Sequence, residues 1–157
     1  MAFDKIESLM EQMRAARQRM KDEGKSALKE AFREFFDDCP EVAAINWTQY
    51  TPYWNDGEPC YFSVQDFCLV LTREARTALL DEEYSEAQQE DAESDHYDGD
   101  HYELNKTSGG RAKQISAQFL KFCKLVRDQD LLENTFGDHV KVHATPKGFD
   151  VTEYSHD

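Results

Sequence analysis

The sequence predicts an α+β fold, in which a long N-terminal helix and a second helix pack on a four-stranded antiparallel sheet made of two β-hairpins. Two kinds of pattern predict it. Apolar residues recur at helical spacing over residues 1–36 and 111–127, and they alternate with polar residues within the segments 43–72 and 139–154. The 157 residues fit a single domain, which at this length needs neither disulfides nor a metal ion to fold.

The N-terminal helix is predicted from an apolar stripe with a period near 3.5 residues. The stripe consists of Phe3, Ile6, Leu9, Met10, Met13, Ala16, Met20, Ala27, Leu28, Ala31, Phe32, Phe35 and Phe36. Its second half is the denser one and is expected to dock on the core, with a bend or break at Gly24. The first half either covers the sheet as an ordinary amphipathic helix or pairs with its copy in a homodimer. Pro40 ends the helix because a proline restricts the residue before it.

Two hairpins follow from composition and turn residues. Residues 43–54 and 60–72 are rich in β-branched and aromatic side chains, and Asp56-Gly57 between them is a turn signal. Along the first strand, Ile45 and Trp47 are expected on one face and Asn46 on the other. Residues 139–154 alternate in the same way around a Pro-Lys-Gly turn, which predicts the second hairpin.

The middle of the chain is predicted to contain an acidic excursion and a basic helix. Residues 73–91 have the composition of a helix, but residues 81–110 are poor in aliphatic side chains, and 74–110 hold 12 acidic and two basic residues. We therefore expect 81–110 to be solvated or mobile, with little protection of its amides from exchange. Residues 111–127 form an amphipathic helix with five basic residues and no acidic one.

The net charge of the chain and the lack of long apolar segments limit the functions that it can have. With 32 acidic and 18 basic residues the net charge is −14, which repels phosphate backbones and disfavours direct binding to nucleic acid. No apolar run approaches the roughly 20 residues of a membrane span, and the N-terminal residues lack the apolar stretch of a signal peptide. These patterns predict a cytoplasmic location and no membrane partner. The four cysteines show no metal-site spacing and are expected to be free thiols.

A candidate binding surface lies in the first hairpin. Residues 37–72 hold six acidic residues, no lysine or arginine, and many aromatic side chains. Carboxylates beside aromatic rings suit a cationic ligand or an arginine-rich protein surface. The predicted binding residues are Trp47, Tyr50, Tyr53, Trp54, Asp56 and Glu58. The alternative is that Trp47 is a core residue and that Tyr53 and Trp54 only pack over the turn.

The sequence offers no catalytic or cofactor motif. It contains no GxSxG, P-loop, HExxH or GxGxxG pattern, so we predict no enzyme activity, no catalytic residue and no cofactor. The segment from Asp95 to His101 groups carboxylates with two histidines, but its spacing does not match a calcium-binding loop. No metal site is predicted.

Two segments carry a resemblance to known proteins. Residues 47–57 read Trp-Thr-Gln-Tyr-Thr-Pro-Tyr-Trp-Asn-Asp-Gly, and a later strand begins with Phe-Gly-Asp-His-Val at 136–140. Together with the long N-terminal helix, they resemble uncharacterised small acidic proteins of phages and bacteria. The resemblance covers residues 40–72 and 130–157. It implies a compact α+β fold and a phage or bacterial origin, and it brings no activity and no site residues.

These observations favour a non-enzymatic acidic protein that binds a basic protein surface, including one that normally holds nucleic acid. Two alternatives stay open. One is a small-ligand-binding or sequestering module, which for a nucleotide would need the basic residues of the helix over 111–127. The other is a structural or chaperone-like homodimer built on the N-terminal helix.

Overall fold

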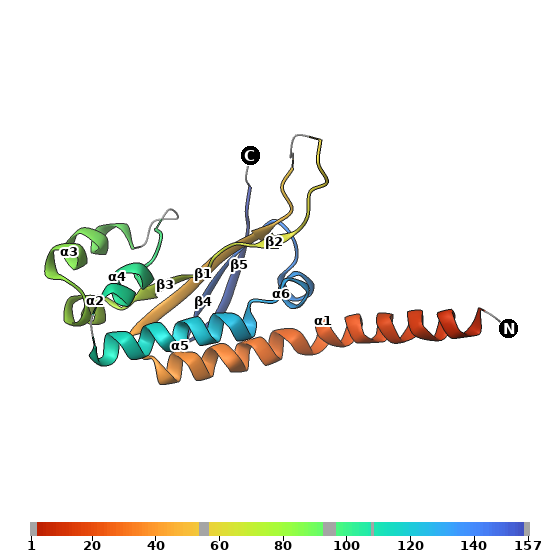
Figure 1. Cartoon of the computed structure of the whole chain (residues 1–157), viewed down its shortest axis with the longest axis horizontal. Coiled ribbons are helices and arrows are strands. Elements are labelled where there is room, and N and C mark those ends of the chain that lie inside the picture. Colours follow the sequence, from red (N-terminus) through yellow and green to blue (C-terminus); the bar gives the residue numbers. More distant parts are fainter. Residues whose placement is uncertain (1–2, 54–56, 93–96, 108, 156–157) are drawn as a thin grey trace.

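The computed structural model describes residues 3–53, 57–92, 97–107 and 109–155, and it confirms an α+β fold with a long N-terminal helix (Figure 1). The described elements are, in chain order, α1 (Asp4–Asp38), β1 (Val42–Tyr50), β2 (Ser63–Val64), β3 (Cys68–Leu71), α2 (Arg73–Leu79), α3 (Glu82–Asp91), α4 (His101–Lys106), α5 (Gly110–Val126), α6 (Gln129–Phe136), β4 (Val140–Thr145) and β5 (Gly148–Glu153). The strands form one antiparallel sheet, and α1 and α5 lie side by side against it (Figure 1).

Both predicted hairpins share this sheet, but it has five described strands instead of four. Its order is β2-β1-β4-β5, and β3 pairs with the same edge of β1 as β2 does. Gln49 is opposite Val64 and Asn46 is opposite Cys68. The segment from Val64 to Cys68 is therefore one residue longer than the segment of β1 that it faces. Such an extra residue is a bulge, and it divides the expected second strand in two.

The core lies between the sheet and the helices α1 and α5. Ile45 and Trp47 share the buried face of β1, as the alternation predicts, while Asn46 on the other face is only partly covered. Phe32 of α1 stacks on Trp47 at 5.8 Å between ring centroids and meets Phe122 of α5 edge-on at 4.8 Å. The denser second half of α1 therefore docks on the core, as expected from its aromatic residues.

The helix α1 continues through Gly24 without the break that was expected there. Gly24 is buried, and a Cβ atom at this position would lie 2.9 Å from Thr135 Oγ1 of α6. The absence of a side chain at Gly24 therefore allows α6 to pack closely against α1, and the glycine does not interrupt α1.

The described part of residues 81–110, where the sequence predicted a solvated or mobile excursion, is largely helical. It contains α3 and α4, and Leu104 and Asp100 are completely buried while Ser85 is almost so. The composition of residues 73–91 indicated α3, but α4 has no long apolar stripe and is held by a few fully buried contacts. Residues 93–96 and 108 of this segment lie outside the described residues.

The helix α6 was not expected from the sequence. Its first turn is capped by Asp128, whose side chain accepts a hydrogen bond from the Leu131 N–H at 2.9 Å. The buried Gln49 of β1 donates to the carbonyls of Leu132 (2.9 Å) and Gly137 (2.7 Å), which fixes the end of α6 against the sheet. Among the described helices, none has the length and apolarity needed to cross a lipid bilayer.

Candidate binding cleft

The described residues of the predicted hairpin site do not form one surface. Trp47 is only 2% exposed and belongs to the core, so a ligand at the surface cannot reach it. Tyr50 is partly buried and packs against Tyr154 at 5.5 Å, whereas Tyr53 is 62% exposed and stacks on His139 at 4.9 Å. Glu58 is exposed. The predicted Trp54 and Asp56 lie outside the described residues.

The base of this hairpin is tied to the start of β4. The backbone N–H and the hydroxyl of Thr51 donate to the two carboxylate oxygens of Asp138, at 2.8 Å and 2.7 Å. Burial raises the pKa of Asp138, but these two bonds and one from the His139 N–H outweigh it and hold the pKa below its ordinary value. The carboxylate therefore stays ionised and fixes the position of the hairpin.

A cleft opens elsewhere, between α3, the loop before α4 and α4 itself. Its volume is about 620 Å³, within the range of ligand sites. It is lined by Tyr84, Gln88, Asp91, Tyr97, Asp98, Gly99, Tyr102 and Glu103. Three rings and three carboxylates thus surround one space. None of the described residues that line it is a lysine or an arginine.

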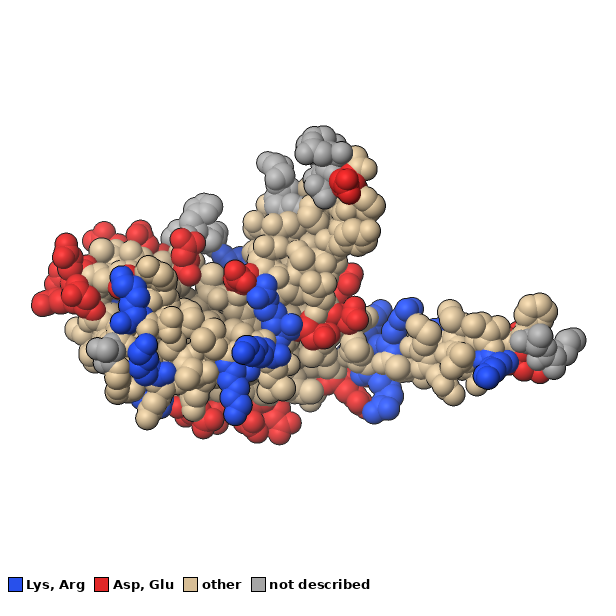
Figure 2. Space-filling view, in the orientation of Figure 1, with Lys and Arg blue, Asp and Glu red and all other residues tan. Residues whose placement is uncertain are grey.

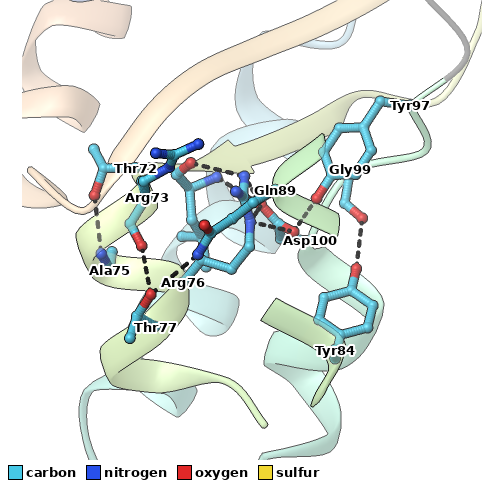
Figure 3. Close-up of polar contacts among 11 residues, drawn as sticks. Thr72, Arg73, Ala75, Arg76, Thr77, Tyr84, Gln89, Tyr97, Gly99 and Asp100 are labelled. Carbon is cyan, nitrogen blue, oxygen red and sulfur yellow. Dashed lines mark hydrogen bonds and ion pairs between the residues drawn. The ribbon is translucent and has the colours of Figure 1, made fainter. Parts of the chain in front are cut away.

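A buried ion pair supports the loop beside the cleft (Figure 3). Arg76 of α2 and Asp100 have side chains that are 3% and 0% exposed, and Arg76 Nη2 lies 3.2 Å from Asp100 Oδ2. Arg76 Nε also donates to Asp100 Oδ1 at 3.2 Å. A guanidinium with several bonds to one carboxylate has little freedom to move, so α2 and the start of α4 are held together.

The same aspartate binds the edge of β3. The Asp100 N–H donates to the Leu69 carbonyl at 2.7 Å, and the Leu71 N–H donates to Asp100 Oδ2 at 2.8 Å. The preceding Gly99 has a φ of +92°, and a Cβ atom there would lie 2.8 Å from the Leu69 carbonyl oxygen. Only glycine fits this backbone conformation at this distance from the strand.

Two of the three tyrosines are fixed through their hydroxyls (Figure 3). The Tyr97 hydroxyl donates to Asp100, and the Tyr84 hydroxyl donates to the Gly99 carbonyl at 3.2 Å. Burial raises the pKa of both phenols, and for Tyr97 the bond to the Asp100 carboxylate raises it further, so both remain proton donors. The rings are therefore rigid walls of the cleft.

The rings of the cleft already bind cations of the chain itself. The Arg76 guanidinium carbon lies 5.8 Å from the centre of the Tyr97 ring, and Lys106 Nζ lies 5.1 Å from that of Tyr102. Both distances are within the range of cation–π attraction. The cleft thus has the chemistry of a site for a positively charged group, with carboxylates and electron-rich rings side by side.

The surface around the cleft is strongly acidic. Figure 2 shows Asp and Glu side chains gathered over the end of the molecule that carries α3, and Lys and Arg side chains along α5. The lysine Lys121 of α5 lines a separate groove of about 330 Å³ between α1 and α5, where Glu34 and Asp38 face it. This groove is not a phosphate site, because carboxylates share it with the single lysine.

Two further groups of polar side chains have no reachable chemistry among the described residues. The Ser116 hydroxyl donates to Asn105 Oδ1 at 3.1 Å and lies 3.2 Å from His101 Nε2, but Ser116 is 2% exposed and a substrate cannot reach it. Within the described ranges, no group of three His, Cys, Asp or Glu side chains is close enough to hold a metal ion. Of the histidine-rich segment considered above, Asp95 and His96 lie outside the described residues.

Sequence reasoning missed the cleft because it counted aliphatic residues in the acidic excursion. The tyrosines of the acidic segment could have indicated the cleft, since Tyr84, Tyr97 and Tyr102 all lie among its carboxylates. Comparison with protein-family models, with curated proteins and with solved structures gives no match for this chain. The fold and the cleft define an acidic α+β protein with a tyrosine-lined anionic cleft. The resemblance to phage and bacterial proteins stays a prediction.

Proposed function

We propose that this chain is a non-enzymatic acidic protein that binds a basic protein partner, and that the cleft between α3 and α4 receives an arginine or lysine side chain of that partner. The observation that carries the proposal is the cleft itself. Three tyrosines and three carboxylates surround about 620 Å³, and none of the described residues that line this space is a lysine or an arginine. The partner would present a surface of the kind that holds nucleic acid, so binding would also mask that surface by charge mimicry.

The interactions that would attract and hold the partner act over different distances. The net charge of −14 attracts a basic partner over a distance and speeds association, although salt screens it beyond a Debye length of about 8–10 Å. Contact with a tyrosine ring adds roughly 0.5–2 kcal/mol, and a carboxylate adds a charge-assisted hydrogen bond. An arginine fits both demands best, because its planar guanidinium stacks on a ring while it binds a carboxylate through two N–H groups.

The exposed part of the first hairpin supplies a second contact in this proposal. Tyr53 and Glu58 are exposed there, and they belong to the binding set predicted from the sequence together with Trp54 and Asp56. Trp47 and Tyr50 are left out, because the first is buried and the second packs against Tyr154.

The cleft can be tested with a peptide of eight arginines and calorimetry at two salt concentrations. The test variant is Asp91→Asn with Asp98→Asn, which removes two lining carboxylates. The matched control is Glu86→Gln with Glu90→Gln, which removes two exposed charges of the same helix region outside the cleft. We expect the test variant to weaken binding at least tenfold and the control to weaken it less than threefold.

Further variants distinguish binding in the cleft from attraction by the overall negative charge. Tyr102→Ala should weaken binding without changing its salt dependence, since it removes a ring and no charge. Equal losses in the test and control variants would show that only the overall charge attracts the peptide, and the proposal for the cleft would then be wrong. An unchanged affinity in all variants would exclude the acidic end as the binding surface.

A small cationic ligand is a second candidate, which the volume of the cleft favours because it lies within the usual range for small-molecule sites. Spermidine and choline are suitable probes. Binding of either one that is tighter than that of the arginine peptide, and that is lost in the Asp91→Asn and Asp98→Asn variant, would favour this function over a protein partner.

A further inference from the structure

The N-terminal half of α1 extends away from the rest of the molecule (Figure 1). With 35 residues at 1.5 Å each, α1 is about 52 Å long. Its buried residues begin at Gly24, and every residue from Phe3 to Arg19 is exposed. Met20 is the first that is partly covered, where its sulfur accepts a hydrogen bond from Asn134 of α6. About half of the helix therefore has no contact with the core.

This free half carries an apolar seam. Phe3, Ile6, Leu9, Met10 and Met13 are between 44% and 70% exposed. The subset Ile6, Leu9, Met13, Ala16 and Met20 follows the alternating spacing of three and four residues that lets two helices wrap around each other. In proteins most of the stability of a helix comes from packing of its apolar face, so the exposed seam calls for a covering partner.

The charges beside the seam show which partner fits. Residues 4–11 hold three acidic residues and one basic residue, a charge of −2, whereas residues 14–21 hold four basic residues and no acidic one, a charge of +4. Two copies placed antiparallel bring the negative segment of each against the positive segment of the other. A parallel pair would instead place +4 against +4, which is repulsive.

We propose that residues 4–21 of α1 form an antiparallel helix pair with the same segment of a second copy of this chain. The twofold axis passes near residues 12–13, so each surface patch contacts its own equivalent. The two sheets then lie at opposite ends of the helix pair. The assembly is independent of the proposed cleft function, because none of the residues that line the cleft belongs to this segment.

The mass of the full chain in solution tests the assembly. Light scattering at about 50 µM should give twice the 18.2 kDa of one chain. Ile6→Asp with Met13→Asp should give 18.2 kDa, because it places charges in the seam at exposed positions that the monomer fold does not use. Circular dichroism of the variant checks that the fold persists. A parent chain of 18.2 kDa at this concentration, or a variant that still dimerises, would overturn the proposal.

Charge reversals test the orientation. The triple reversal Arg14→Glu, Arg17→Glu and Arg19→Glu changes residues 14–21 from a charge of +4 to −2 and should raise the dissociation constant of the dimer at least tenfold. Adding Glu7→Lys with Glu11→Lys changes residues 4–11 from −2 to +2 and should restore most of the affinity, since the segments have then exchanged signs. The matched control is Lys25→Glu with Lys29→Glu and Arg33→Glu, which makes the same charge change at exposed positions of α1 outside the segment. Tighter association of the first variant would contradict the antiparallel pair, because only a parallel pair gains from reducing +4 against +4.

Discussion

Arg76 and Asp100, 24 residues apart in the sequence, form an ion pair that water hardly reaches. Both residues also bind the same strand, because Arg76 Nη2 donates to the Leu71 carbonyl at 3.1 Å while the Leu71 N–H donates to Asp100. The pair thus joins α2, β3 and α4 at one point. The same carboxylate accepts the hydrogen bond of the Tyr97 hydroxyl, so the ion pair also fixes one wall of the cleft.

Replacing Arg76 by methionine should strongly destabilise the protein. The change leaves the Asp100 carboxylate buried without its cation, which costs about 3–5 kcal/mol of unfolding free energy in comparable pairs. Urea unfolding measures this loss. The control Arg73→Met, at an exposed position of the same helix, should change stability by less than about 0.5 kcal/mol. Similar losses in both variants would mean that the ion pair does not hold this region.

Replacing Gly99 by alanine should destabilise the fold by about 1–3 kcal/mol or more. Alanine is strained at a φ of +92°, and its Cβ atom would also meet the Leu69 carbonyl oxygen at 2.8 Å. Gly57→Ala is a matched control, because Gly57 has a similar φ of +83° but no atom within 4 Å of the added Cβ. The difference between the two losses in urea unfolding isolates the clash. We expect Gly99→Ala to be clearly the worse variant.

His101 should make stability depend on pH just below neutrality. Burial lowers the pKa of His101 from its ordinary 6.5, so below about pH 6.5 the unfolded chain takes up a proton that the native state refuses. Unfolding free energy therefore falls as pH drops from 6.5 toward the native pKa, with a slope of at most about 1.4 kcal/mol per pH unit.

The comparison of the parent chain with His101→Gln between pH 7.5 and 5.5 isolates this contribution, since the two chains differ only at this position. The parent should lose more stability than the variant over this window. Parallel curves would show that His101 has the same pKa in both states.

Two of the four thiols should resist alkylation in the native state. Burial raises the pKa of Cys123 to about 12, and Cys39 is fully buried with its thiol donating to Gln118 Oε1 at 2.7 Å. Because the thiolate is the reactive form, iodoacetamide at pH 7.5 should label the partly exposed Cys60 first. Peptide mass mapping after short exposure, repeated in urea, gives the order. Equal native and unfolded rates at Cys123 would contradict its burial.

The sequence by itself determined the elements that have a strong internal period. The stripe that contains Leu28 and Phe32 predicted α1, and the stripe through Ile115 and Phe119 predicted α5, because every third or fourth residue of a helix meets the core. The alternation within 43–54 and 139–154 predicted strands β1, β4 and β5 and their shared sheet. Such periods are local, since each depends only on which face of one element is covered.

Only the tertiary structure decided where the acidic segment goes and which aromatic residues reach the surface. Arg76 and Asp100 are single residues whose pairing has no period in the sequence, and this pairing holds α2 against the start of α4. Trp47 and Tyr53 look alike in composition, but one is 2% and the other 62% exposed. Burial of a single side chain depends on contacts made by distant segments. For this reason the cleft beside Tyr84 and Tyr97 became visible only once those segments were assembled in space.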